Sequence, residues 1–272
     1  MAEPRDPADS KLAVLASGRR VWAVAAIHGE ALMLERLHAE LEPRLGSGDA
    51  VVYLGNVLGR GGAIVAAVDE VLRFRRTFLA RRRAFAADMV FLRGVQEEMW
   101  VKLLQVQFAP NPRQVLEWMA GQGIGPTVKA YGGRIEDGLI AAKGGPLTLF
   151  RWANPLRLAM QRAPGHGALI SALRRAAYSD DRALLLVHAG VDSTRPLSEQ
   201  NDSFWWGGRD FDRLAEGALG FKRIVRGYDP AHKGVRLDSF AATVDGGAGF
   251  GGPLVAACLD GNRIVDRIEA GP

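Results

Sequence analysis

The sequence predicts an α/β protein in which strands and helices alternate at first and strands dominate the end. Short apolar runs, typical of buried strands, recur at residues 21–25, 50–54, 88–92 and 183–187. Segments with helical spacing lie between them, whereas after residue 221 four more apolar runs follow at 223–225, 241–244, 254–259 and 264–268. Alternation followed by a strand-rich end is typical of an α/β sandwich.

The helical segments are predicted from spacing and from their end signals. Residues 31–45 place Leu34, Leu37 and Leu41 on one face, and a proline and a glycine mark the end. Residues 64–85 carry a longer helical pattern. From about residue 97 to residue 178 we expect mainly helices, interrupted by glycine-rich loops at 121–125 and 132–146.

Length and composition predict one folded domain. The 272 residues, 48% of them hydrophobic, are enough for one substantial core. Residues 1–11 are polar, so we expect a disordered tail there and a single domain over residues 12–272. No apolar run is long enough to span a bilayer. Cys258 is the only cysteine, which excludes an intrachain disulfide and fits a cytoplasmic location.

One familiar glycine motif is present but lies in the wrong context. Gly247, Gly249 and Gly252 satisfy G-x-G-x-x-G. A dinucleotide-binding fingerprint must follow a strand and open a helix. Here Pro253 and an apolar strand follow, so we reject the motif.

Five short segments, each next to a predicted strand, carry the functional signal. They are AAIHGE (25–30), LGNVLGRG (54–61), LRGVQEE (92–98), LVHAGVD (186–192) and VRGYDP (225–230). Their order resembles the motifs of calcineurin-like metallophosphoesterases of the serine/threonine phosphoprotein phosphatase branch: GD-x-HG, GD-x-x-DRG, GNHE, HAG and GH. The resemblance spans roughly residues 15–268. It implies a four-layer αββα sandwich of two mixed β-sheets with a helical insertion.

The chemistry of that family explains what its motifs need. Two divalent metals about 3.5–4 Å apart activate a water and hold the phosphoryl group. They require imidazoles and hard oxygen ligands, including a bridging carboxylate.

This chain departs from the family at most of those positions. The resemblance implies metal ligands at six positions, of which His28 and His188 are retained and Asn56 keeps only an amide oxygen. Ligands are lost at Ala26, Val95 and Tyr228. The second aspartate of the DRG motif is Gly59, and the general acid is replaced by Gln96.

A pair of metals is therefore not expected. At an effective dielectric of 20, two dications 4 Å apart repel by roughly four times the ~4 kcal/mol of two unit charges. No carboxylate in the motifs remains to offset that repulsion. The sequence predicts no cofactor, or at most one divalent metal on His28 and His188 helped by Glu30, Asp192 or Asp229.

Other side chains were assigned by their position relative to the motifs. Arg60 matches the phosphate-gripping arginine of the second motif, and Arg209, in WWGGRD, matches another. The remaining histidines, His38, His166 and His232, are predicted to be surface or loop residues. Trp205 and Trp206 are predicted to pack in the sandwich.

An arginine cluster at residues 73–83 is the second candidate surface. Its members are Arg73, Arg75, Arg76, Arg81, Arg82 and Arg83. Because apolar residues, Phe85 among them, are interleaved, the pattern predicts an amphipathic helix. A solvated face is the alternative to a surface that docks on an acidic protein or anionic lipid, and nucleic acid is the less favoured partner.

Together these observations predict a pseudophosphatase, a phosphatase scaffold that binds or regulates without hydrolysing. Its partner would be a protein or a phosphorylated ligand gripped by Arg60 and Arg209. Two alternatives stay open at this point. One is a weak phosphoesterase with a single metal on His28 and His188. The other is a structural subunit, or a binder of anionic partners through residues 73–83.

Overall fold

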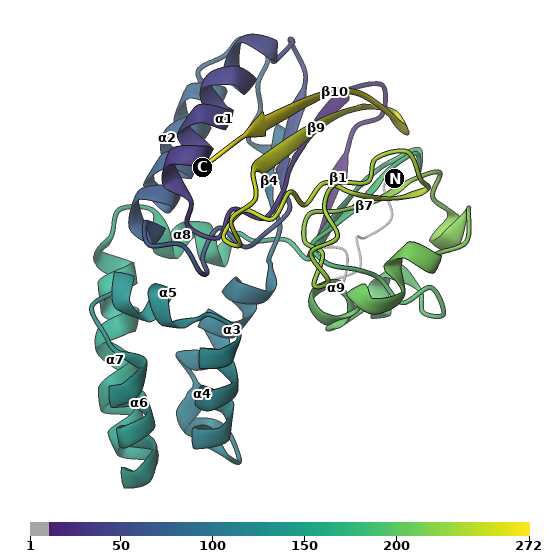
Figure 1. Cartoon of the computed structure of the whole chain (residues 1–272). Coiled ribbons are helices and arrows are strands. Elements are labelled where there is room, and N and C mark those ends of the chain that lie inside the picture. The colour runs from purple at the N-terminus through teal and green to yellow at the C-terminus, as the bar shows by residue number, and fades with distance from the viewer. Residues whose placement is uncertain (1–10) are drawn as a thin grey trace, which may run out of the picture.

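The structure is a computed structural model that describes residues 11–272, apart from the side chain of Arg209. Two five-stranded mixed sheets form its centre (Figure 1). The first has the order β1 (Leu12–Leu15), β5 (Ala176–Ser179), β6 (Leu185–Val187), β7 (Ile224–Arg226) and β8 (Ala241–Thr243). The second has the order β10 (Arg263–Ala270), β9 (Leu254–Asp260), β2 (Arg20–Val24), β3 (Ala50–Tyr53) and β4 (Met89–Phe91).

Parallel pairing within each sheet brings the functional loops to common edges. β2, β3 and β4 are parallel neighbours, with Trp22 opposite Val51 and Val51 opposite Met89. β6, β7 and β8 are parallel neighbours in the other sheet. Because parallel strands end at the same edge, the loops that follow them meet there.

The core lies between the two sheets. Along β6 and the residue before it, Leu184 and Leu186 face this core, whereas Leu185 and Val187 face the outside of the first sheet. This alternation is the period of two expected of a strand. On the outer face, aromatic side chains of residues 204–221 cover the strands and form a second apolar cluster.

Helices cover the outer faces and form the insertion. α1 (Ala31–Arg44) and α2 (Ile64–Leu79) lie along the second sheet, and α9 (Ser203–Trp206) lies by the first (Figure 1). Between β4 and β5 a helical insertion extends away from the sheets (Figure 1). It contains α3 (Val95–Leu103), α4 (Pro112–Gly121), α5 (Gly125–Ala130), α6 (Ile135–Ala141), α7 (Pro146–Arg162) and α8 (His166–Ser171). The predicted αββα sandwich with a helical insertion is confirmed.

Short 3-10 helices complete the secondary structure. They are Ala86–Asp88, Val106–Phe108, Ala142–Gly144, Leu197–Glu199, Gly208–Arg213 and Ala218–Gly220. Among residues 11–272, no helix is long and apolar enough to cross a membrane.

The structure corrects three of the predicted elements. Residues 12–15 and 176–179 are strands that pair in parallel with each other, although the first was not predicted and the second was assigned to a helix. α2 ends at Leu79 and not at residue 85, and Phe85 is 61% exposed. Most of the predicted tail, residues 1–10, lies outside the described residues.

Two histidines predicted to lie at the surface are buried. His38 Nδ1 is 2.5 Å from Glu70 Oε1, and its Nε2 is 2.8 Å from the Tyr53 hydroxyl. His166 makes the same kind of chain, because its Nδ1 is 2.9 Å from the hydroxyl of Tyr131 and its Nε2 contacts an α2 carboxylate. Both rings are 1% exposed. The prediction was wrong because the hydrogen-bond partners are distant in sequence.

Candidate functional site

Loops from both sheets meet at one edge and bring the predicted site residues together. The Ala26 N–H donates to the Gly227 carbonyl (3.0 Å), joining the loop after β2 to the loop after β7. The His188 Nδ1–H donates to the Leu54 carbonyl (2.7 Å), joining the loop after β6 to the loop after β3. His28, Asn56, Gln96, His188 and Tyr228, which lie up to 200 residues apart in the chain, therefore form one cluster.

Asn56 sits at the centre of the cluster with its amide orientation fixed. Its Oδ1 accepts a hydrogen bond from the Gln96 N–H (2.9 Å), so its Nδ2 is the group that faces His28 Nε2 at 3.2 Å. The side chain is fully buried. The amide thus bonds to protein on both sides, and its oxygen is already engaged at the position where the family has a bridging carboxylate.

His28 is held as a neutral imidazole. Burial is the main cause that lowers its pKa to about 3, with a further contribution from the nearby His188 and Arg60. Because Nε2 accepts from Asn56, the ring proton of the neutral form is on Nδ1. His28 Nδ1 has no hydrogen-bond partner among the described residues. Nε2, which has the lone pair, already accepts a hydrogen bond from Asn56. Nδ1, which has no partner among the described residues, carries the proton.

His188 and Tyr228 form a stacked pair. Their rings are 5.2 Å apart and nearly parallel, at 6°. Burial lowers the pKa of His188 to about 4, so this ring is also neutral near pH 7. Since Nδ1 donates to Leu54, Nε2 carries the lone pair, and it has no partner among the described residues. Tyr228 therefore places an aromatic ring where the family has a histidine ligand.

Aromatic side chains also cover the outer side of the cluster. Phe250 contacts His28 edge-on at 5.3 Å, and His232 lies against Phe250 at 3.9 Å. His232 is also 5.7 Å from Tyr228, so it belongs to the cluster although the ring itself is exposed. The Arg60 guanidinium lies over the Phe250 ring at 4.8 Å, a cation–π distance.

The buried carboxylates closest to the cluster are bonded to the backbone. Glu97 accepts from the N–H groups of Asn56 (2.9 Å), Leu58 (2.9 Å) and Gly94 (2.8 Å), while its burial raises its pKa. Glu97 thereby ties the start of α3 to the loop after β3 and holds Asn56 in position. Its carboxylate is part of the scaffold and is not directed at a ligand.

The carboxylates of Asp245 and Asp229 also accept hydrogen bonds from backbone N–H groups. Asp245 accepts from the Asp229 and Gly247 N–H groups, at 2.8 and 2.9 Å. Asp229 accepts from the Ala231 and Lys233 N–H groups and forms a 3.0 Å ion pair with the buried Arg226. The sequence analysis named Asp229 as an adventitious metal donor, and the structure engages it elsewhere.

The backbone at the cluster leaves no room for the missing aspartate of the second motif. Gly59 has a φ of +141°, and a Cβ added there would lie 2.4 Å from His28 Nδ1. A side chain at residue 59 therefore requires His28 to move. His28 and Asn56 themselves adopt φ values of 55° and 53°, which non-glycine residues seldom use. Such conformations persist only where the surrounding contacts determine them, as they do here.

Three more motif positions, Val95, Ala26 and Gln96, make contacts within the protein. Val95 belongs to the apolar cluster outside the first sheet, and Ala26 is buried behind the loop contact with Gly227. The Gln96 side chain points to the insertion, where its Nε2 donates to the Gln122 carbonyl (2.8 Å).

These donors do not fit the two-metal centre that the family carries. Among residues 11–272, no three His, Cys, Asp or Glu side chains are grouped so that they could hold a metal ion. The cluster offers two neutral imidazoles and an amide, with no negative charge to offset one dication, still less two. Of the other two proposed donors, Asp192 caps its own turn through Thr194, and Glu30 stands at the N-cap of α1.

Arg60 remains a candidate anion contact. Its Nη2 approaches the Gly121 carbonyl at 3.5 Å, and no carboxylate among the described residues forms an ion pair with it. Arg209 was predicted to share this role, but its side chain lies outside the part that the structure describes. Trp205 packs as predicted and donates from Nε1 to the Arg93 carbonyl (2.8 Å), whereas Trp206 is 38% exposed.

The arginine cluster divides into structural and exposed members. Arg73 pairs with Glu70 at 2.5 Å, and Arg81 donates to the carbonyls of Glu42 and Leu45. Arg75 is half-buried, and the exposed members that form no ion pair among the described residues are Arg76, Arg82 and Arg83. Because α2 ends at Leu79, residues 81–83 lie in a turn and do not continue a basic helix. They line a concavity of about 580 Å³ together with Ser47.

The sequence analysis missed several residues that shape the site. Phe250 and Glu97 were not singled out, whereas His232 is exposed as predicted although it also contacts Phe250. A signal for Glu97 was present, because an acid three residues after Gly94 satisfies a capping pattern at the start of α3. Nothing local identified Phe250, whose contact with His28 joins segments more than 200 residues apart.

Comparison with solved structures agrees with the architecture. A protein described as a diadenosine tetraphosphatase superposes with a TM-score of 0.55 and 18% identity, over 96% of this chain and 98% of that one. A serine/threonine phosphatase from Saccharomyces cerevisiae with similarity to human PP5 gives 0.52 and 13%, over 97% and 86%. A cold-active protein-tyrosine phosphatase from a psychrophilic Shewanella gives 0.51 and 16%, over 96% and 82%.

No family model matches the chain, and no curated protein matches it either. Identities this low establish architecture and leave activity open. The two mixed sheets, their αββα layers and these neighbours show that the chain has the metallophosphoesterase fold.

Proposed function

We propose that this chain is a catalytically inactive relative of the metallophosphatases that serves as a binding or regulatory module. The proposal rests on the hydrogen bonds of Asn56, at the position of the family's bridging carboxylate, and of the carboxylates near it. The Asn56 amide is bonded on both sides, and the nearby carboxylates Glu97, Asp229 and Asp245 are bonded to the backbone. Among the described residues, no carboxylate at this cluster is left to hold a metal pair or to activate water.

The imidazoles are poor substitutes for the lost machinery. A general base works best with a pKa near the operating pH. The pKa values of His28 and His188 are lowered to about 3 and about 4, so neither ring accepts a proton readily near pH 7. Gln96, at the general-acid position, has no ionisable proton. Hydrolysis therefore lacks both a strong nucleophile and a proton donor.

Binding of a phosphorylated ligand is the retained part of the family chemistry that we propose. Arg60 holds its guanidinium at the outer side of the cluster, over Phe250 and free of carboxylates among the described residues. A guanidinium suits phosphate because its planar fork donates two parallel hydrogen bonds. Arg209 stays a prediction as the second arginine of this grip.

Metal analysis together with a phosphatase assay tests the loss of activity. The full chain is incubated with Mn²⁺ and desalted, its metal content is measured, and hydrolysis of p-nitrophenyl phosphate is followed. We expect less than about one metal per ten chains and turnover no faster than buffer. Stoichiometric metal with turnover that Asn56→Ala abolishes would overturn the proposal.

Phosphopeptide titration tests the binding role separately. A phosphoserine peptide and its unphosphorylated counterpart are titrated into wild type, Arg60→Gln and the control Arg151→Gln, which changes an exposed arginine of α7. We expect a preference for the phosphorylated peptide that Arg60→Gln removes and Arg151→Gln leaves unchanged. Equal binding of both peptides by all three proteins would refute phosphate recognition at Arg60.

A weak phosphoesterase with one metal is the second candidate. The observation in its favour is the unpartnered lone pair of His188 Nε2. One neutral imidazole binds a divalent ion weakly, and His28 would have to release Asn56 to join it. This candidate predicts activity that rises with Mn²⁺ and disappears in His188→Ala; activity that persists in His188→Ala would come from a contaminant.

A third candidate is an anionic partner that docks on the exposed arginines Arg76, Arg82 and Arg83. The concavity beside Ser47 supports it, because arginine forks line a hollow that fits an acidic group. Binding through this surface should fall steeply with salt and weaken in the Arg82→Gln/Arg83→Gln pair but not in Arg151→Gln. A cytoplasmic location remains a prediction.

A further inference from the structure

The helical insertion contains a pocket that is separate from the cluster of His28, Asn56 and His188. It has a volume of about 600 Å³ and lies between α3, α7 and α8. This volume is within the roughly 300–1,000 Å³ range of small-molecule sites. The pocket borders the C-terminal part of α3, whereas Gln96 and Glu97 begin that helix. Trp100, the first pocket residue on α3, lies four residues beyond Gln96, about 6 Å along the helix at 1.5 Å per residue.

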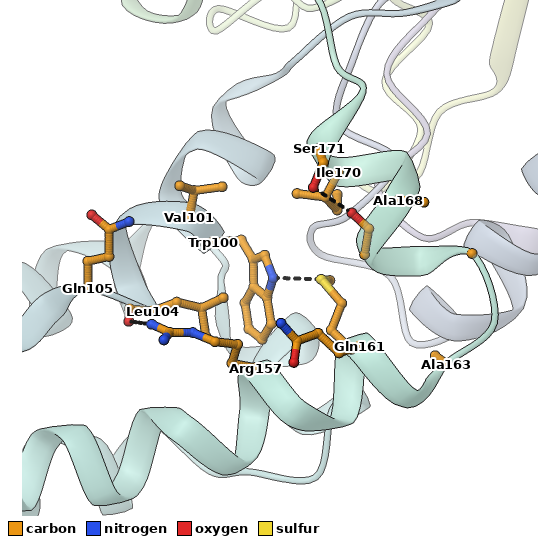
Figure 2. Close-up of a pocket in the computed structure, with 13 residues that line it drawn as sticks. Trp100, Val101, Leu104, Gln105, Arg157, Gln161, Ala163, Ala168, Ile170 and Ser171 are labelled. Atoms are coloured by element: carbon orange, nitrogen blue, oxygen red, sulfur yellow. Dashed lines mark hydrogen bonds between the residues drawn. The ribbon is translucent and has the colours of Figure 1, made fainter.

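The α3 side of the pocket carries apolar side chains. Figure 2 shows Trp100 at its centre, with Ile170 on the α8 side. The Trp100 indole is 0% exposed and donates from Nε1 to the sulfur of Met160 at 3.0 Å. Val101 and Leu104 extend the apolar wall along α3. An aliphatic chain or aromatic ring placed here would cover hydrophobic surface at little conformational cost.

A single charged side chain lies in this apolar setting. Arg157 is half-buried, and Figure 2 shows it beside Leu104, to whose carbonyl its Nη2 donates at 2.6 Å. None of the described carboxylates pairs with it. The other polar lining side chains, Gln105, Gln161 and Ser171, are neutral. A half-buried guanidinium without a counter-charge attracts an anion, because its charge is less well solvated than at an open surface.

We propose that this pocket binds an amphipathic carboxylate, such as a medium-chain fatty acid. The apolar tail would lie against Val101 and Leu104, the partly exposed apolar side chains of α3. The carboxylate would accept hydrogen bonds from Arg157, in the planar geometry that a guanidinium favours. The argument for a carboxylate over a neutral lipid is charge complementarity.

Calorimetric titration of the full chain with decanoate, below its micelle concentration, tests the proposal. Arg157→Gln keeps a donor for the Leu104 carbonyl and removes the charge. Arg151→Gln, on the same helix and outside the pocket, is the matched control. We expect saturable binding of decanoate that Arg157→Gln weakens at least tenfold and Arg151→Gln leaves within twofold. Decanol, with the same tail and no charge, should bind weakly and equally to all three proteins.

A second variant tests the pocket without touching the arginine. Ala168 lines the rim and is exposed, so Ala168→Trp should fill the space without disturbing the core. This variant should abolish decanoate binding while its thermal midpoint without ligand stays near that of wild type. Absence of decanoate binding to wild type would overturn the proposal. So would equal affinity for decanol, or binding that survives both Arg157→Gln and Ala168→Trp.

These outcomes are independent of the proposed loss of catalysis. The titration uses no metal and no phosphate. Its variants, at residues 151, 157 and 168, lie outside the cluster that contains His28 and His188. A chain that proved to be an active phosphatase would leave the decanoate result unchanged.

Discussion

Gly59→Ala is predicted to destabilise the protein more than a surface glycine replacement should. Two terms contribute. Alanine at a φ of +141° is strained by about 1–3 kcal/mol. Its Cβ would meet His28 Nδ1 at 2.4 Å and Gln96 Cγ at 3.1 Å, an overpacking that costs about 1–3 kcal/mol. We therefore expect a loss of about 2–6 kcal/mol in the free energy of unfolding.

A double-mutant cycle with His28→Ala separates the two terms. Removing the ring removes most of the steric term but none of the backbone term. Gly59→Ala should therefore cost about 1–3 kcal/mol less in the His28→Ala background than in wild type. The assay is urea unfolding followed by circular dichroism. Gly62→Ala is the control, because nothing lies within 4 Å of its added Cβ, and it should change stability by less than about 0.5 kcal/mol.

Two results would refute the reasoning. Gly59→Ala with the stability of wild type would show that the loop has room for a side chain at the family's aspartate position. A cycle with no coupling would show that His28 is not the group that excludes it. If Gly59→Ala yields no folded protein, recovery of folding in the double variant tests the same steric contact.

The remaining predictions concern buried charge and pH. Since the unfolded chain binds protons at His28 and His188 with a pKa near 6.5 and the folded chain does not until about 3 and about 4, stability should fall as pH drops below 6.5. At pH 5 each of these two histidines costs about 2 kcal/mol. Urea unfolding at pH 7.5 and 5.0 should show that His188→Gln makes the drop smaller by about that amount, while the buried His38, whose pKa burial also lowers, continues to contribute. Asn56→Asp should gain no Mn²⁺-dependent phosphatase activity. It should also lose about 1–3 kcal/mol above pH 7, because a buried carboxylate would face the His28 lone pair; an active Asn56→Asp would contradict our account of the cluster. Arg226→Leu should cost about 3–5 kcal/mol in chemical unfolding, because Asp229 would lose its buried partner and keep only the 3.5 Å ion pair with the partly exposed Arg236. A loss below about 1 kcal/mol would show that the Arg226–Asp229 pair is replaceable.

The strands and the loops that follow them were predictable because their signals are local. Apolar runs such as residues 50–54 and 254–259 become β3 and β9 within one residue at each end. The motif order that resembles the phosphatase family implied that the segments containing His28, Asn56 and His188 form one site. The loss of carboxylates was also visible in the sequence, because a substitution at a motif position needs no coordinates to be seen.

Long-range pairing limited the prediction of the other elements. β1 and β5 are four residues each and become strands only by pairing with each other across more than 160 positions. His38 and His166 are polar residues whose burial depends on Glu70 and Asp69, supplied by a different helix. We predicted a single basic helix because the apolar spacing is helical through residue 79 and the arginines continue beyond that residue.

By itself the sequence determined most of the strands and their order along the chain, the loops that carry the motif positions and the residue types at those positions. Only the tertiary structure decided that Phe250 and His232 cover the cluster, that Glu97 is bonded to the backbone and that residue 59 has no space for a side chain. The physical reason is that local propensity depends on neighbouring residues, whereas packing and hydrogen-bond satisfaction depend on groups that folding brings together from distant parts of the chain.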